Sequence, residues 1–409
     1  MPAPIGNVLL TDNVIAKEAL MIVENNLTIT KLINRRYEPK FAQDGNKIGD
    51  TLNIRLPVRW QGRTGETMTP EPAIERTIPL KIDQLIGQDL QFSNVDLTLK
   101  IDQFKERYLD TACASIANRI DQSVCAQYIN CPNVAGVPGV VPNSLDPYFD
   151  ASVTLSNFGV PQGKRNIVIS PRMEATIVNA LKGLFQAASK IADQYTTGEM
   201  GHVIGFDWYM DQNIVAHTVG ALGGAPLVSG ANQTGSTILL KGFAAAAAPR
   251  LKQGDSITFA GVNSVNPQSR ADNGELRMFV VTAPVSSDAS GNASVPIFPA
   301  IVTTGALQNV TASPADSAVV KVFGDPLSRQ NVVSKQGLAF HKEWLTAAFV
   351  DLDLPKGMAM AARAKSDKLG LSIRIVKGYD IQSNQELCRL DVLYGLKQTY
   401  EDFCCRIAS

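Results

Sequence analysis

Two stretches with strand periodicity flank a segment that has few residues able to form a core. Apolar and polar residues alternate over residues 51–58, and a second alternating run covers residues 74–82. The segment between them, WQGRTGETMTPEPA, consists mostly of glycine, proline, threonine and charged residues. The pattern predicts a long hairpin that projects from the body of the protein, because its tip cannot bury much of itself.

Charges of opposite sign are divided between the two limbs of this hairpin. The first limb and the tip carry Arg55, Arg59 and Arg63, and the return carries Glu66, Glu71 and Glu75. Solvation is the usual explanation for such charges. The alternative is an arm whose charges pair with those of a neighbouring molecule. On that hypothesis the six residues are candidate contacts between subunits.

Residues 11–26 predict a short amphipathic helix that stands apart from the elements after it. A helix of this length is unstable alone in water, so it must lie on a surface. That surface is either its own domain or another chain, and the pattern favours neither.

Residues 93–130 predict a much longer helix. Ser93 and Asp96 fit a capping pattern, and apolar residues then recur every three or four positions. At about 1.5 Å per residue, a helix of this length extends roughly 50 Å. Between a coiled coil and a helix that lies across a sheet, the mixed sizes of its apolar residues favour the second.

The next part of the chain alternates between helix and strand. Residues 133–163 hold four prolines and are expected to be rich in loops. They precede a buried strand at 166–170, a helix at 171–184 and a turn into a strand within 201–214. The alternation predicts an α+β domain.

From about residue 218 to residue 325 the chain has few charges and many small residues. Five short alternating runs, at 236–240, 255–260, 277–282, 294–298 and 319–323, are separated by turn signals such as those at 272–274 and 290–292. These runs predict a small barrel or sandwich. Mixed patterning resumes afterwards, with strands at 371–376 and 389–394, so this part resembles an insertion.

Composition and motifs exclude several classes of function. The 38 basic and 38 acidic residues cancel, which argues against a protein that binds nucleic acid by a basic excess. The six cysteines are scattered and are expected to be free thiols, and the three histidines have no ligand spacing, so no metal or cofactor is expected. The start of the chain does not read as a signal peptide, and no apolar run approaches the roughly 18 residues of a membrane span. The catalytic motifs that we sought do not occur, and Asp351 and Asp353 remain as a weak hydrolase hypothesis.

Several segments resemble the major capsid (coat) proteins of tailed bacteriophages in the P22 coat-protein family. LKQGDSITFAGVNSVNP at 251–267 and MFVVTAPVSSDASGNASVPIFPAI at 278–301 resemble that family's inserted β-domain. NVVSKQGLAFHKEWLTAAFVDLDLP at 331–355, LGLSIRIVKGYDI at 369–381 and CRLDVLYGLK at 388–397 resemble its C-terminal region, and IGFDWYMDQNI at 204–214 is similar to the turn before the insertion. No single motif is diagnostic, but their order along nearly the whole chain is specific.

The resemblance implies an HK97-type capsid fold of the α+β class with an inserted small β-barrel. Its parts are expected to be an N-terminal arm (1–44), an E-loop hairpin (45–82), a peripheral P-domain with a spine helix (83–135), the first part of an axial A-domain (136–217), an insertion domain or I-domain (218–328), and the A-domain remainder with return strands to the P-domain (329–409). In relatives the I-domain supports folding of the monomer and contacts between capsomers, and it carries a longer loop. The corresponding segment here, 263–274, is short, and Arg270, Asp272 and Glu275 in or beside it are candidate contact residues.

The resemblance also implies what the chain does and with which partners. Subunits would form pentamers and hexamers that assemble with a scaffolding protein and a portal protein in the host cytoplasm. The shell would then expand around double-stranded DNA that it holds without sequence specificity, and a decoration protein is an open question; no membrane partner is expected. Some shells of this type are cross-linked through an E-loop lysine, but no lysine lies between Lys47 and Lys81. An encapsulin-like cellular compartment is the alternative, and nucleic acid inside purified particles would distinguish the two.

Overall fold

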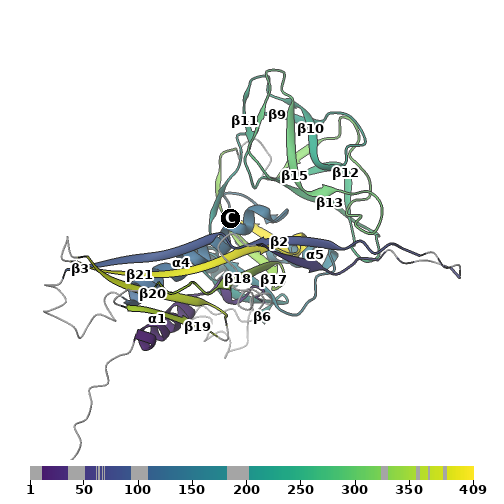
Figure 1. The fold of residues 1–409 in the computed structure, drawn as a ribbon. Helices are drawn as coiled ribbons and strands as arrows, with labels where there is room; N and C mark the ends of the chain where they lie inside the picture. Colours follow the sequence, from purple (N-terminus) through teal and green to yellow (C-terminus); the bar gives the residue numbers. More distant parts are fainter. Residues whose placement is uncertain are drawn as a thin grey trace, which may run out of the picture. The chain divides into compact units, whose positions relative to one another are not determined.

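A computed structural model describes residues 12–35, 51–60, 62, 65, 66, 68, 70–93, 109–181, 202–323, 330–355, 360–366, 369–380 and 385–409 (Figure 1). The chain divides into two compact units. Unit 1 consists of Met1–Ile54, Pro79–Val124 and Thr346–Lys397. Unit 2 consists of Arg55–Ile78, Cys125–Leu345 and Gln398–Ser409.

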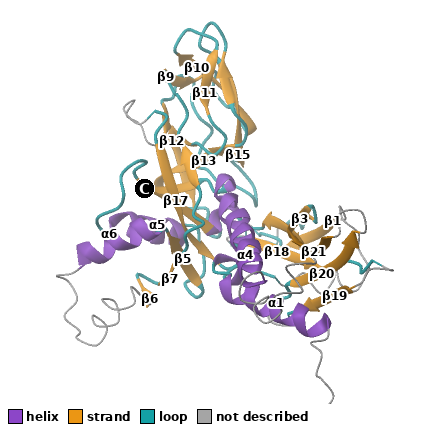
Figure 2. Ribbon diagram, turned by 90° about the vertical axis from the view of Figure 1, so that its left-hand side faces the viewer, coloured by secondary structure: helices purple, strands orange, loops and turns teal. Residues whose placement is uncertain are grey.

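Within its described residues, unit 1 is built on a five-stranded sheet of order β18-β21-β20-β19, in which β3 also pairs with β21. The strands are β3 (Gln84–Ser93), β18 (Leu345–Val350), β19 (Met360–Lys365), β20 (Ser372–Asp380) and β21 (Gln385–Gln398). The helices are α1 (Asp12–Asn26), the short 3-10 helix η1 (Ile29–Lys31) and α4 (Asp110–Cys125). Figure 2 shows α1 and α4 against this sheet. The expected strands at 371–376 and 389–394 are confirmed within β20 and β21.

The predicted N-terminal helix is confirmed as α1. Its residues Ala16, Ala19, Leu20 and Val23 are buried and recur at helical spacing. The helix packs against β19 and β20, and Ser366 donates a hydrogen bond to Glu24. Of the two surfaces that the sequence left open, the helix therefore lies on its own unit.

The predicted long helix begins later than expected. Ser93 is the last residue of β3, which pairs with β21 from Gln84↔Tyr394 to Ser93↔Gln385. That continuous ladder satisfies the backbone of 84–93, a strand that the sequence analysis missed, and so the helix cannot start there. Residues 94–108, Asp96 included, lie outside the described part of the chain. From Ala112 onward the expected spacing holds, since Ala112, Ile116, Ile120 and Val124 are all buried. The 3-10 helix η3 (Ala126–Asn130) follows α4.

The predicted hairpin is present as the paired strands β1 (Thr51–Leu56) and β2 (Arg76–Lys81). Its base is anchored in a small hydrophobic cluster consisting of Ile54, Leu80, Ile82, Ala348, Val350 and Leu393. Both strands are shorter than the alternating sequence indicates. The tip therefore includes Ile74, which the pattern assigned to the return strand.

The part of unit 2 that the structure describes contains a seven-stranded sheet of order β4-β22-β17-β5-β7-β6, with β8 beside β17. Its strands are β4 (Asn133–Gly136), β5 (Arg165–Ile169), β6 (His202–Val203), β7 (Phe206–Met210), β8 (Ala216–Thr218), β17 (Val333–His341) and β22 (Cys404–Ala408). Every residue of β5 and β22 is buried, as is typical of strands covered on both faces. The 3-10 helix η5 (Glu401–Phe403) leads into β22.

The expectation of a loop-rich segment at 133–163 is wrong in part, because it contains the helix α5 (Asp146–Asn157). Pro147 lies in the first turn, where a missing N–H costs no hydrogen bond, so this proline starts the helix instead of breaking it. Tyr148, Ala151 and Leu155 are fully buried against the sheet. The predicted helix at 171–184 is confirmed as α6 (Pro171–Leu181), and its last residues lie outside the described range.

The expected barrel is present in unit 2 (Figure 1). Six of the described strands form one sheet of order β16-β12-β13-β15-β10-β9, and a bridge between Leu227 and Val319 closes it. The strands are β9 (Gly224–Val228), β10 (Gly235–Phe243), β12 (Ser256–Val265), β13 (Asp272–Val281), β15 (Ala293–Ile301) and β16 (Val320–Val322), with the small pair β11 (Ala248–Leu251) and β14 (Val285–Ser287). Inside, the rings of Phe259 and Phe279 lie 5.5 Å apart. All five alternating runs fall on barrel strands.

One predicted turn is wrong: residues 272–274 begin β13 instead of separating two strands. The turn lies at 266–271, where the nitrogen of Asn266 donates to the oxygen of Ala271 over 2.9 Å. Gly274 has a φ of +75° beside a shift in the β12–β13 register, so the turn-forming residues accommodate a bulge within the strand.

The barrel is connected to the seven-stranded sheet through two neighbouring strands. The chain enters the barrel after β8 and comes back at β17, and Thr218 of β8 is paired with Val333 of β17. Removal of the whole barrel from the sequence would therefore leave two strand ends side by side.

Candidate subunit-contact surface

The hairpin presents charged residues to solvent. Arg55 is exposed because it alternates along β1 with the buried Ile54 and Leu56. Glu66 and Glu75, on the tip and the return, are also exposed. These three of the six hairpin candidates are placed where a second molecule could reach them.

Arg59 and Glu71 are only partly exposed, and both act electrostatically on Arg270 of the barrel. Burial lowers the pKa of the Arg270 guanidinium, Arg59 lowers it further, and Glu71 acts in the opposite direction. The structure thus brings members of the two predicted candidate sets together within unit 2. Arg63 lies outside the described residues.

Asp272 and Glu275 have different surroundings on β13. The carboxylate of Asp272 accepts hydrogen bonds from Asn263 Nδ2 at 3.0 Å and from the nitrogen of Gly274 at 2.8 Å. These bonds hold the pKa of Asp272 below its ordinary value. Asp272 therefore stabilises the bulge of its own strand, whereas Glu275 is an exposed side chain.

Three apolar side chains of the hairpin are exposed candidates for subunit contacts that were not predicted from the sequence. Trp60, Met68 and Ile74 expose 55%, 79% and 48% of their surface. Interfaces typically combine such apolar anchors with a polar rim, and tryptophan is enriched among the residues that dominate binding energy. Trp60 could have been predicted as a contact residue, because it lies in a segment that cannot form a core.

A buried ion pair ties the barrel to the rest of unit 2. Arg277 of β13 donates from Nη2 to Asp402 Oδ1 of η5 over 2.5 Å, and the two side chains expose 1% and 8% of their surface. The guanidinium carbon lies 4.5 Å from the centre of the Phe158 ring. Because Asp402 is 125 positions away in the chain, no local pattern could have revealed this pair.

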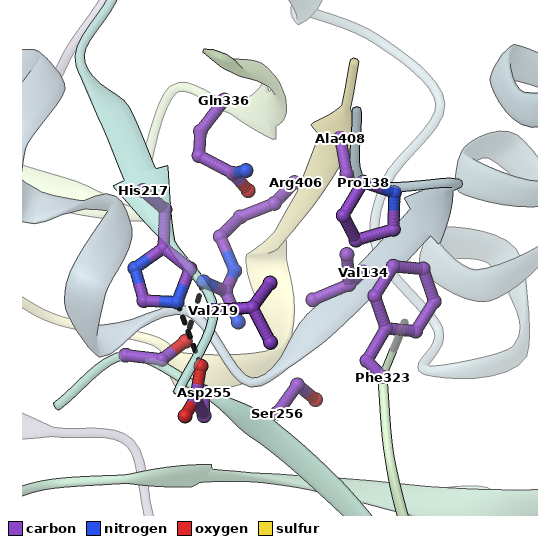
Figure 3. A pocket seen from close by; sticks show the side chains of 11 residues that line it. Val134, Pro138, His217, Val219, Asp255, Ser256, Phe323, Gln336, Arg406 and Ala408 are labelled. Atoms are coloured by element: carbon purple, nitrogen blue, oxygen red, sulfur yellow. Dashed lines mark hydrogen bonds and ion pairs between the residues drawn. The ribbon is translucent and has the colours of Figure 1, made fainter. Parts of the chain in front are cut away.

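A small pocket at the same junction contains a second buried polar network (Figure 3). His217 Nε2 lies 2.9 Å from Asp255 Oδ1, and His217 Nδ1 lies 3.3 Å from the hydroxyl of Tyr128. Arg406 Nη1 donates to the carbonyl of Gly254 over 2.8 Å. These bonds offset part of the cost of burying the Asp255 carboxylate and the Arg406 guanidinium, whose Nε has no hydrogen-bond partner among the described residues.

Histidine, aspartate and serine line this pocket, which are the residue types of a hydrolase triad. The hydroxyl of Ser256, however, donates to the carbonyl of Pro132 over 2.8 Å, and both ring nitrogens of His217 already contact Asp255 and Tyr128. No base is therefore placed to activate the serine. The arrangement supports a structural role.

The aspartates of the hydrolase hypothesis take part in contacts with arginines. Asp351 Oδ2 lies 4.0 Å from Arg363, and the backbone oxygen of Asp353 accepts from Arg374 Nη1 over 2.8 Å. Across the described ranges, no three metal-ligating side chains are grouped to hold an ion. None of the helices described is long and apolar enough to span a bilayer.

The comparisons with known proteins decide the family. Residues 7–401 match the family described as "P22 coat protein - gene protein 5". The chain belongs to the P22 coat protein family. It is therefore a capsid protein of a bacteriophage, which is a structural component of the virion and not an enzyme. The capsid is assembled from copies of this protein.

The coat protein is also similar to solved structures. It shares 12% identity with a chain of Mycobacterium phage Che8, over 93% of this chain and 90% of that one, with a TM-score of 0.48. For the capsid of Ralstonia phage GP4 the identity is 9%, the coverages are 92% and 87%, and the TM-score is 0.48. The CUS-3 coat protein I-domain is 24% identical over 25% of this chain and 97% of its own, with a TM-score of 0.19. No curated protein matches the chain.

Proposed function

We propose that this coat protein forms pentamers and hexamers that assemble with a scaffolding protein and a portal protein into a rounded procapsid. The shell then expands while double-stranded DNA is packaged, after assembly in the host cytoplasm. The zero formal charge supports this, because strong phosphate contacts inside the shell would hinder packaging. A decoration protein would be an additional partner on the outside.

In this proposal the architecture is that of the HK97-type fold. Residues 1–44 are the N-terminal arm, 45–82 the E-loop, 83–135 the P-domain, 136–217 and 329–409 the two parts of the A-domain, and 218–328 the I-domain. The order of elements supports this division, since the hairpin precedes α4 and the barrel interrupts the sheet between β8 and β17. On this division α4 belongs to the spine helix.

The exposed apolar tip of the hairpin carries the proposal. Trp60 and Met68 expose more than half of their surface in a segment between two charged limbs. A monomeric protein gains nothing by extending such a segment into water, whereas a subunit that covers it with a neighbour removes apolar area from solvent. Each such contact is weak alone, but many of them act together in a closed shell.

The test is particle formation by the full-length coat protein expressed together with a scaffolding protein. Electron microscopy should show closed shells for the natural chain and few for Trp60→Ser, Arg55→Glu or Arg59→Glu. The matched control is Tyr379→Ser, because Tyr379 has a similar exposure of 50% on β20 of unit 1. Circular dichroism of each unassembled variant verifies its fold. Equal numbers of shells from all variants would refute a contact role for the hairpin.

A further inference from the structure

The chain passes between the seven-stranded sheet and the barrel twice, at neighbouring places. The pairing of Thr218 with Val333 continues one step toward the barrel, where the nitrogen of Val219 donates to the oxygen of Val332 over 3.0 Å. A pair of strands without further support is only marginally stable and can bend and twist. The covalent path alone would therefore let the barrel point in many directions relative to the sheet.

The carboxylate of Asp255, at the start of β12, adds contacts beyond this path. Its Oδ1 lies 2.9 Å from His217 Nε2 of β8, and its Oδ2 accepts from the nitrogens of Gly220 at 3.2 Å and Lys252 at 2.8 Å. Asp255 is 3% exposed, so a loss of these bonds would leave a bare charge away from water. One side chain thus joins a strand of the sheet, the segment that enters the barrel and the turn before β12.

The two neighbours of Asp255 in the sequence contact other parts of the same sheet. Arg406 Nη1 of β22 donates to the carbonyl of Gly254 over 2.8 Å, and the hydroxyl of Ser256 donates to the carbonyl of Pro132, just before β4, over 2.8 Å. Arg406 and Ser256 are both buried. Consecutive residues at the start of β12 therefore contact β22, β8 and the segment before β4.

The next strand of the barrel, β13, is held separately. Arg277 donates to Asp402 of η5 over 2.5 Å and lies over the ring of Phe158, which follows α5. The nitrogen of Val134 in β4 donates to the sulfur of Met278 over 3.3 Å. A body fixed at one strand can rotate about that point, whereas a body fixed at two strands cannot.

We propose that these contacts lock the β12–β13 hairpin to the seven-stranded sheet, so that the barrel and the sheet move as one rigid body. Asp255 is the positioning residue at the base of this hairpin. At its turn, Asn266 Nδ2 donates to the carbonyl of Asn157 of α5 over 3.4 Å, so the hairpin is held from its base to its turn. The direction of the barrel is then set within the subunit and not by a neighbour. This inference goes beyond the proposed assembly and does not depend on it.

The experiment measures the distance between barrel and sheet in unassembled, full-length subunits. Spin labels at Leu239→Cys on β10 and Val153→Cys on α5 occupy exposed sites outside the junction, and the six natural cysteines are buried. Pulsed electron paramagnetic resonance should give one narrow distance distribution for this background. Asp255→Ala should replace the narrow peak with a broad distribution. Asp255→Asn should broaden it less, because the amide oxygen can still accept from the two backbone nitrogens.

A second variant tests the contact on β13. Arg277→Met/Asp402→Leu removes the ion pair without leaving a buried charge unpaired, and it should also broaden the distribution. This double variant decides the test if Asp255→Ala does not fold.

Two controls separate the loss of the lock from a loss of barrel stability. Asp288 also accepts from two backbone nitrogens, those of Ser290 and Asn292 at 2.8 Å each, but both belong to the barrel's own β14–β15 turn. Asp288→Ala should leave the peak narrow. Phe259→Leu weakens the packing inside the barrel and should also leave the peak narrow below the melting temperature of the variant.

A narrow peak in Asp255→Ala would overturn the positioning role of Asp255, and a narrow peak in both junction variants would overturn the lock. The lock is equally overturned if the background itself gives a broad distribution, or if Phe259→Leu broadens the peak as much as Asp255→Ala does. Because no shell is needed, the result is independent of whether particles form.

Discussion

Asp121 of α4 binds Thr30 twice, accepting hydrogen bonds from its hydroxyl at 2.6 Å and from its backbone nitrogen at 3.1 Å. The second carboxylate oxygen accepts from the nitrogen of Thr28 at 2.7 Å. Asp121 is 1% exposed, so these bonds are made away from water. One buried carboxylate therefore fixes the segment that leaves α1.

Asp121→Ala should lower the free energy of unfolding of the subunit by about 2–4 kcal/mol, since it removes a charged acceptor and leaves buried donors without a partner. Denaturant titration of unassembled subunits measures this. Asp89→Asn is the control, because that side chain on β3 is 81% exposed and its replacement should change little. A loss at position 121 no larger than that of the control would contradict the interpretation.

Breaking the Arg277–Asp402 pair should be more costly than replacing it. Arg277→Met leaves a buried carboxylate unpaired, and we expect a loss of about 3–5 kcal/mol in the free energy of unfolding. The double variant Arg277→Met/Asp402→Leu should lose less than either single variant. Lys241→Met in the solvated pair with Asp316 should have a minor effect. Additive losses in the double variant would argue against direct coupling.

Gly87 is required by the close approach of β3 and β21. A Cβ atom at this position would lie 2.6 Å from the oxygen of Leu390 and 2.7 Å from Asp391 Oδ1. Asp391 is itself fixed by Arg374 at 2.6 Å and Arg389 at 2.7 Å, so it cannot move aside. Gly87→Ala should therefore cost about 1–3 kcal/mol of stability.

The control for this substitution is Gly163→Ala, because a Cβ there meets nothing within 4 Å. Thermal melting of both variants, followed by circular dichroism, gives the comparison. Equal melting temperatures would show that the strands can separate locally at low cost.

The pH dependence of stability should change when Asp211 is replaced by asparagine. Burial raises the pKa of Asp211 in the folded chain, so folding favours its protonated form. The aspartate therefore destabilises the fold increasingly as the pH rises from its unfolded pKa through its raised folded pKa. Asp211→Asn should stabilise the subunit at neutral pH and have no such benefit below the unfolded pKa. Denaturant midpoints measured from acid to neutral pH test this. A gain in stability of Asp211→Asn that occurs only at low pH would contradict the prediction.

The six cysteines should not react with thiol reagents in the folded subunit. All are buried and free, and burial raises the pKa of Cys113 to about 12 and those of Cys404 and Cys405 well above their ordinary value. Iodoacetamide at mildly alkaline pH should modify none of them natively and all of them in denaturant, as counted by mass spectrometry. Native labelling of Cys404 or Cys405 would mean that β22 opens.

Elements with a local signature could be predicted from the sequence. The hairpin and the barrel strands have period-two alternation within a few residues, and α1 has its own helical stripe. β3 could not be recognised, because its ladder pairs it with β21 about 300 positions later. The prolines of 133–163 indicated loops, but whether a proline breaks or begins a helix depends on its position, and Pro147 lies in the first turn of α5.

The candidate site was predictable only as a set of residue types. The sequence predicted the hairpin charges as contact residues, but not that Arg59 and Glu71 act electrostatically on Arg270 while Arg55 and Glu75 are exposed. That distinction depends on the tertiary structure, because the interacting residues are about 200 positions apart in the chain. The charge of each residue can be identified from the sequence, whereas its partners depend on the tertiary structure.

The pairing of Thr218 with Val333 brings together the two ends of the segment that forms the barrel. Because the chain departs and re-enters on adjacent strands, lengthening, trimming or replacing the barrel need not alter the strand order of the sheet it leaves. Mutations on the outside of the barrel can thus accumulate without changing the strand order of the sheet.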